Sequence, residues 1–139
     1  MTFSLRDLYA ALFAAALTMC IASLVVAQNA PGPVRTILQR HDTTAAGYEA
    51  VLVKVEIPVG GREGRHTHPG LATGYVEQGT LTLEYEGRPT IAYKPGDSFI
   101  LEPGKVHEGI NTGNVPVKAV ATFVVEKGAS LTTPATPGK

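Results

Sequence analysis

The sequence has 139 residues, enough for one domain and hardly enough for two. Its 12 basic and 12 acidic residues balance, which argues against nucleic acid or an anionic membrane surface as the main partner, because both call for a basic patch. The single cysteine, Cys20, lies in an N-terminal apolar segment, so the remainder of the chain can form no disulfide.

That N-terminal segment is uncharged and mostly apolar from Leu8 to Ala27. It ends in Val25, Val26 and Ala27, with small residues where a signal peptidase cleaves, so residues 1–27 are predicted to be a signal peptide removed after Ala27. The apolar run is also long enough to cross a bilayer, and an uncleaved membrane anchor is the alternative. In both cases we expect a periplasmic or secreted domain, which meets a membrane only if the leader is not cleaved.

Residues 28–33 are predicted to be a linker rich in Pro and Gly, and residues 34–128 the folded domain. Apolar and polar residues alternate within three segments of this domain, Glu49–Ile57, Thr80–Glu86 and Val117–Val125. Such alternation is typical of a half-buried strand. Shorter candidate strands are Val34–Gln39, Arg65–His68, Thr73–Gln78, Thr90–Tyr93, Ser98–Leu101 and Val106–Asn111. Residues 129–139 are predicted to be a disordered tail.

Turn signals rich in Gly and Pro separate the candidate strands, and no segment of the predicted domain shows a convincing helical period. About nine short strands at this spacing predict an all-β fold, either a sandwich or a barrel. Gly79 and Gly96 stand where strands reverse and where a positive φ is expected. Asn111 ends its strand and is expected to tie the next turn through its side chain.

Three histidines form the main candidate site. On a strand, His66 and His68 point to the same face, roughly 6.6–7 Å apart along the strand. His107 begins another strand after a Pro-Gly turn. Imidazoles that converge can bind one ion with bonds of about 2.0–2.1 Å, and imidazole suits zinc, iron, copper and nickel. From the His66–His68 pair alone, unrelated surface or core histidines are the better interpretation.

The residues around these histidines resemble two motifs of the cupin superfamily. The first motif, G-x5-H-x-H-x3,4-E-x6-G, is matched by Gly60, His66, His68 and Gly79. The second, G-x5-P-x-G-x2-H-x3-N, is matched by Gly96, Gly104, His107 and Asn111. The resemblance implies a small single-domain cupin, an antiparallel double-stranded β-helix or jelly-roll barrel. It also implies that His66, His68 and His107 bind one divalent metal ion.

Two positions depart from these motifs. The first motif's glutamate, normally a ligand of a cupin metal, should fall where the sequence has Ala72 and Thr73. Three neutral histidines with open positions for water or substrate then favour iron, zinc, nickel or copper over manganese, which prefers oxygen ligands. Glu102 replaces a proline of the second motif. We expect Glu102 in a loop at the rim; the alternative is a carboxylate that points into the cavity.

Other residues are candidates for the pocket or for contacts with the ligands. Position 72 is one, because the missing glutamate would stand there. His41 lies in a polar segment and could line the barrel mouth, although an exposed loop position is expected for it. Tyr75 and Tyr85 could supply hydroxyl groups, and Tyr85 shares a strand face with apolar residues, so core packing is its default.

Three arginines near the first motif, Arg35, Arg62 and Arg65, could hold an anionic substrate, but a loop of mixed charge is the commoner explanation for them. No phosphate loop, nucleophile elbow or dinucleotide fingerprint is present in the sequence.

The leading functional hypothesis is a metal-dependent enzyme of the dioxygenase type that acts on a small organic molecule. Open coordination positions favour chemistry, because structural zinc sites are usually closed. The sequence identifies no general base. The alternatives are a non-catalytic module that captures a small molecule or metal, and a barrel without metal that serves as a structural or interaction protein. Single-domain cupins are commonly dimers, so the resemblance also implies a homodimer.

Overall fold

The computed structural model describes residues 32–135, which form ten β-strands and no helix. The predicted signal peptide, residues 1–27, lies outside the described residues, as does most of the predicted linker. Nothing in the described range is a helix of the length and apolar character needed to cross a membrane.

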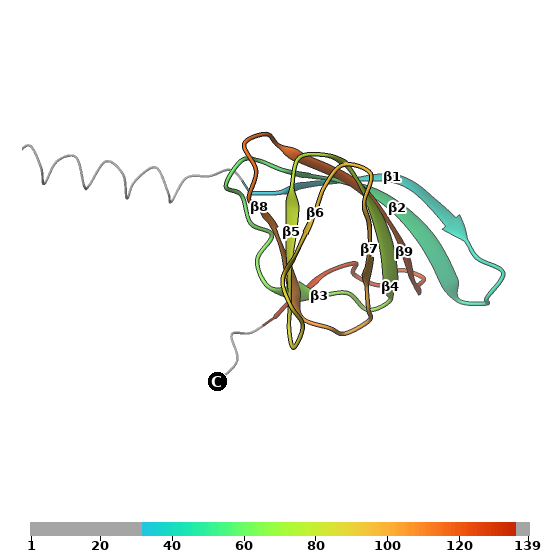
Figure 1. Cartoon of the computed structure of the whole chain (residues 1–139). Helices are drawn as coiled ribbons and strands as arrows, with labels where there is room; N and C mark the ends of the chain where they lie inside the picture. The colour runs from blue at the N-terminus through green and yellow to red at the C-terminus, as the bar shows by residue number, and fades with distance from the viewer. Residues whose placement is uncertain (1–31, 136–139) are drawn as a thin grey trace, which may run out of the picture. The chain divides into compact units, whose positions relative to one another are not determined.

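The strands form two five-stranded sheets, which face each other in Figure 1. The first sheet contains, in spatial order, β1 (Val34–Asp42), β2 (Tyr48–Ile57), β9 (Val117–Glu126), β4 (Leu71–Gln78) and β7 (Ser98–Leu101). The second contains β10 (Thr133–Pro134), β3 (His66–Thr67), β8 (His107–Asn111), β5 (Leu81–Tyr85) and β6 (Ile91–Tyr93). Every named strand pair is antiparallel. The predicted all-β architecture is confirmed.

The core lies between the two sheets because alternate residues of each strand turn inward. In β2, Val51, Val53 and Ile57 are buried, and in β9 every second residue from Val117 to Val125 is buried. The polar residues between them stay at the surface or half-buried. Strands β4, β5 and β7 add their own apolar faces to the same cluster. The alternation visible in the sequence therefore determines which face of each strand is buried in the interior.

The predicted turn residues adopt the expected conformations. Gly79 and Gly96 have positive φ angles of 80° and 98°. Gly79 is also crowded, since a Cβ there would lie 2.8 Å from the carbonyl oxygen of Pro116. The Asn111 side chain donates to the carbonyl of Val115 at 2.9 Å and accepts from the amide of Gly113 at 3.0 Å. Asn111 thus ties the turn between β8 and β9.

The C-terminal segment differs from the prediction of a disordered tail over residues 129–139. Thr133 and Pro134 form β10, which pairs with Thr67 and His66 of β3. Leu131 packs against the core from the same segment. The Thr- and Pro-rich composition predicted disorder, but β3 would otherwise present unpaired backbone groups at the edge of the sheet, and β10 satisfies them.

Strand β1 also differs from its prediction, because it continues past Gln39 to Asp42. Pairing with β2 extends it, with His41 opposite Ala50 and a register shift between Ile37 and Gln39. All residues of β1 are exposed, as befits an edge strand. Figure 1 shows the β1–β2 hairpin reaching past the rest of the barrel.

Candidate metal centre

His66, His68 and His107 come together inside the barrel. His66 of β3 pairs directly with His107 of β8, and His68 follows β3 in the chain. The three residues are buried, with exposed fractions of 3%, 3% and 1%. Their ring centroids lie 4.5 to 4.8 Å apart. The antiparallel pairing of these two short strands thus brings the three imidazoles close together.

The backbone fixes the tautomer of each ring. The three Nδ1 atoms lie at hydrogen-bond distance from carbonyl oxygens: His66 from Gly64 at 2.7 Å, His68 from Leu131 at 2.7 Å, and His107 from Lys105 at 2.9 Å. A carbonyl oxygen only accepts, so each Nδ1 carries the proton and donates it. In a neutral ring, Nε2 then keeps a free lone pair. A backbone carbonyl that holds the other ring nitrogen is the usual partner of a metal-binding histidine.

The Nε2 atoms of His68 and His107 are spaced as ligands of one ion, and His66 lies close to both. Those of His68 and His107 lie 3.1 Å apart, and the ligand atoms of all three histidines lie within 4.8 Å of one another. Two nitrogens bound at about 2.0–2.1 Å lie roughly 2.9–3.4 Å apart for octahedral or tetrahedral angles. Because both Nδ1 atoms hold the protons, neither Nε2 can donate to the other. The three-histidine cluster therefore fits a divalent transition metal ion.

Burial keeps the three rings neutral. It lowers the pKa of His66 and His107 below the ordinary histidine value. It lowers the pKa of His68 to about 4, with a further contribution from the charges that the other two histidines would carry. Because only the neutral ring has a lone pair for a metal, the buried site favours the ligand form at neutral pH.

Tyr85 supports the position of His107. The two residues are paired between β5 and β8, and their rings stack with centroids 5.4 Å apart and an interplanar angle of 16°. The tyrosine hydroxyl accepts a hydrogen bond of 2.8 Å from the backbone amide of Glu102. Tyr85 is therefore a core residue in contact with a candidate ligand.

Ala72 takes the position of the missing glutamate on the inner face of β4. Its side chain is fully buried, and its partners in the sheet are Leu101 and Phe123. Thr73, the other position that the first motif allows, is exposed. Among the described residues, the cluster of possible ligands contains the three histidines and no carboxylate.

Three other candidates do not line the cavity beside the histidines, as was expected for His41 and Glu102. Tyr75 is 47% exposed on β4, because the alternation that buries Ala72 turns Tyr75 outward. His41 is exposed on β1, and its Nδ1 lies 2.7 Å from the carbonyl oxygen of Asp42. The Glu102 carboxylate pairs with Arg88 at 2.6 Å and is 41% exposed, so it lies at the rim, as expected, and not in the cavity.

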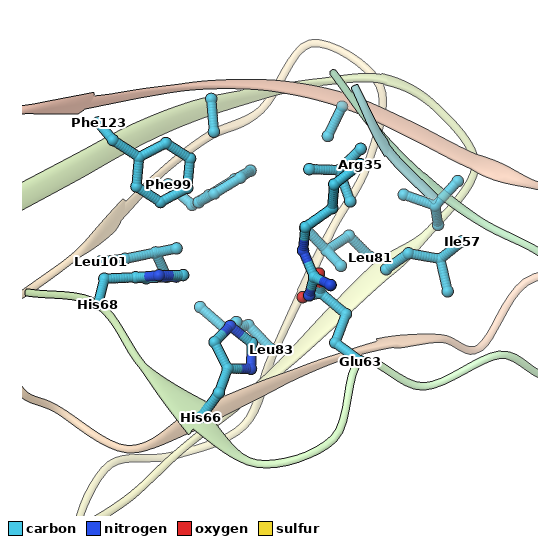
Figure 2. Close-up of a pocket in the computed structure, with 14 residues that line it drawn as sticks. Arg35, Ile57, Glu63, His66, His68, Leu81, Leu83, Phe99, Leu101 and Phe123 are labelled. Carbon is cyan, nitrogen blue, oxygen red and sulfur yellow. The ribbon is translucent and has the colours of Figure 1, made fainter. Parts of the chain in front are cut away.

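A cavity of about 40 Å³ adjoins the candidate ligands. His66 and His68 line it, and apolar side chains of β2, β5, β7 and β9 form most of its remaining wall. Figure 2 shows Phe99, Leu101 and Phe123 on the side near His68. The arrangement places the three-histidine cluster beside a small apolar cavity, as in a ligand site.

An ion pair between Arg35 and Glu63 also lines the cavity (Figure 2). Nη2 of Arg35 donates to Oε1 of Glu63 at 2.6 Å, and the Glu63 side chain is 12% exposed. Burial raises the pKa of Glu63, while the charge of Arg35 opposes this shift. Of the three arginines near the first motif, Arg62 instead pairs with Glu108 at 2.7 Å, on the other face of β8 from His107.

Sequence reasoning missed Glu63 because it lies in the irregular segment between β2 and β3. Its amide donates to the carbonyl of Gly109 at 2.9 Å. A Cβ at position 109 would lie 2.3 Å from Oε2 of Glu63, so a larger residue there would displace the carboxylate from its present position. A glycine within a strand often marks such a close approach, and Gly109 was the available signal.

Comparison with known proteins gives a consistent family and fold. A family model described as Cupin domain matches residues 53–125. No curated protein matches the chain.

Three solved structures illustrate the shared fold. A protein with a double-stranded β-helix domain from Klebsiella pneumoniae subsp. pneumoniae MGH 78578 is 24% identical over 76% of this chain and 86% of its own, with a TM-score of 0.61. A cupin-like protein from Thermotoga maritima MSB8 is 17% identical over 74% and 75%, with a TM-score of 0.62. A recombinant oxalate oxidase in complex with glycolate is 22% identical over 70% and 53%, with a TM-score of 0.57. These similarities establish the fold and nothing finer.

Proposed function

Since the chain belongs to the cupin family, we propose that it is an exported metalloenzyme in which His66, His68 and His107 bind one divalent transition metal ion. The observation that carries the proposal is the convergence of three Nε2 lone pairs, each left free by a hydrogen bond from Nδ1 to a backbone carbonyl. The proposed substrate is a small organic molecule in the adjoining cavity.

The ligand count favours a catalytic ion over a structural one. A structural zinc site usually has four protein ligands, whereas three protein ligands leave positions for water or substrate. The cavity that His66 and His68 line would give a substrate access to those positions. Iron, zinc, nickel and copper suit a set of neutral imidazoles better than manganese does.

The reaction that we propose is an oxidation of the dioxygenase type, with O₂ as co-substrate. When bound, a redox-active ion would supply the electron transfer that O₂ requires, and the protein would supply the site. The shared fold with an oxalate oxidase is the support for choosing an oxidation. The apolar wall of the cavity would exclude bulk water from the reacting groups.

Metal analysis of protein purified without an affinity tag tests the proposal. We expect one equivalent of a transition metal in the wild type. Single substitution of His66, His68 or His107 by Ala should abolish stoichiometric metal, because each removes one of three ligands. His41→Ala is the matched control, since His41 is an exposed histidine on β1, and it should keep the metal. Full occupancy in all three single variants would show that the ligand assignment is wrong.

Oxygen consumption distinguishes the enzyme from its alternative. The metal-loaded protein is supplied with short organic acids, diketones and thiols while dissolved O₂ is recorded. Substrate-dependent consumption that is lost in His107→Ala supports the enzyme. Tight binding of a small molecule without consumption of O₂ would instead support a non-catalytic binding module.

A further inference from the structure

Arg35 lies where the cavity meets solvent. It is the most exposed of the lining residues, with a side chain that is 34% exposed, while the other lining side chains are buried or half-buried. In Figure 2 its guanidinium turns into the same space as the rings of His66 and His68. A ligand that enters beside Arg35 would therefore pass this cation on its way to the histidines.

The guanidinium has spare hydrogen-bonding capacity. An arginine carries five N–H donors, and the hydrogen bonds among the described residues engage Arg35 through Nη2 with Glu63 alone. The planar donor fork matches a carboxylate better than an ammonium group does. Arg35 can thus bind a carboxylate while it keeps its contact with Glu63.

The charges of the cavity favour an anion. Arg35 has a charge of plus one and Glu63 of minus one, and the three histidines are neutral, so the net charge of these groups is zero. A divalent ion would raise this net charge to plus two in a largely apolar cavity, and an uncompensated buried charge is costly. Arg35 lines the same cavity as His66 and His68, so its charge lies close to the candidate metal site.

The size of the cavity limits the ligand. A water molecule needs at least about 10–15 Å³ of such volume, so about 40 Å³ holds only a few groups of that size. A short organic acid fits this space, whereas an aromatic acid or a sugar does not.

From these observations we propose that the substrate is a short organic acid whose carboxylate is held by Arg35 while its other end faces the three-histidine site. Glu63 is the ion-pair partner of the guanidinium in the same cavity. This inference rests on the proposed metal binding, because the ion provides the charge that the anion balances.

Calorimetric titration with glycolate tests the inference, using protein loaded with Zn²⁺ and purified without a tag. Glycolamide is the matched control ligand, since it has the same size and no charge. We expect glycolate to bind about tenfold to a hundredfold more tightly, because a hydrogen bond to a charged group is stronger than one to a neutral group. Equal affinity for the two compounds would overturn the proposal, and this comparison needs no variant.

Two variants distinguish binding of the carboxylate by Arg35 from a purely structural role of the ion pair between Arg35 and Glu63. Arg35→Met/Glu63→Gln removes both charges together, so no lone carboxylate is left buried, and glycolate affinity should fall by about tenfold or more because the donor fork is lost. Glu63→Gln alone keeps the cation and should bind glycolate at least as tightly as the wild type. Wild-type affinity in the double variant would overturn the role of Arg35. Metal content is measured before each titration, so a failure to bind metal is distinguished from a failure of Arg35 to bind the carboxylate.

Discussion

At the scale of the residue, the candidate site depends on the neutral form of its histidines. Burial lowers the pKa of His68 in the folded chain to about 4 from an ordinary value of 6.5. Between these values the unfolded chain takes up a proton that the folded chain does not. The free energy of unfolding therefore keeps its full value above pH 6.5 and decreases as the pH falls towards 4.

We expect the free energy of unfolding of the metal-free protein to decrease by on the order of 3 kcal/mol over this interval from His68 alone. Urea unfolding at a series of pH values measures it. His68→Gln should flatten the profile, while the exposed His41→Gln should leave it unchanged. An identical pH profile in His68→Gln and the wild type would contradict the assignment.

The residues of the site were predictable to different degrees. His66, His68 and His107 stand in recognisable motifs, and antiparallel pairing of β3 with β8 was enough to unite them. Arg35 and Glu63 are 28 positions apart; Arg35 lies in a predicted strand and Glu63 in an irregular segment. Their contact depends on how Arg35 of β1 meets the cavity and on the space beside Gly109, which only the folded chain defines.

At the scale of the element, β10 and the residues before it complete the metal site. The carbonyl of Leu131 accepts the hydrogen bond from Nδ1 of His68 at 2.7 Å, and β10 pairs with β3. The long strands were predictable because their alternation matches a buried face. β10 was not, since its short Thr-Pro sequence has no such pattern and is fixed by the edge of β3.

Truncation of this segment should weaken metal binding. A chain that ends after Gly128 loses the partner of His68, and loss of such a partner typically costs about 10–100-fold in metal affinity. Competition with a chelator measures the affinity. A chain that ends after Ala135 keeps both Leu131 and β10 and is the control. Equal affinity in the two truncated chains would show that the segment does not position His68.

At the scale of the whole molecule, the first sheet ends in a strand that has apolar residues and no outer neighbour among the described residues. Val34, Ile37 and Leu38 of β1 are 60%, 49% and 52% exposed. Edge strands of this kind tend to pair or to be covered. This exposure supports the proposal of a homodimer that buries β1.

Sedimentation velocity tests the dimer. We expect the wild type to sediment as a dimer and Ile37→Lys/Leu38→Lys to sediment as a monomer, because each protomer would have to bury two charges in the contact. Lys54→Ala, on the neighbouring β2, is a control for a change in surface charge and should remain dimeric. A wild type that is monomeric at tens of micromolar would contradict the proposal.

The bond between His68 and Leu131 also has a consequence for the order in which the protein matures. The groups that shape the centre come from segments as far apart in the chain as Gly64 and Leu131. A chain in which the segment after β9 has not yet docked lacks the carbonyl that fixes the ring of His68. The three-histidine cluster therefore reaches its final arrangement only when this late segment is in place.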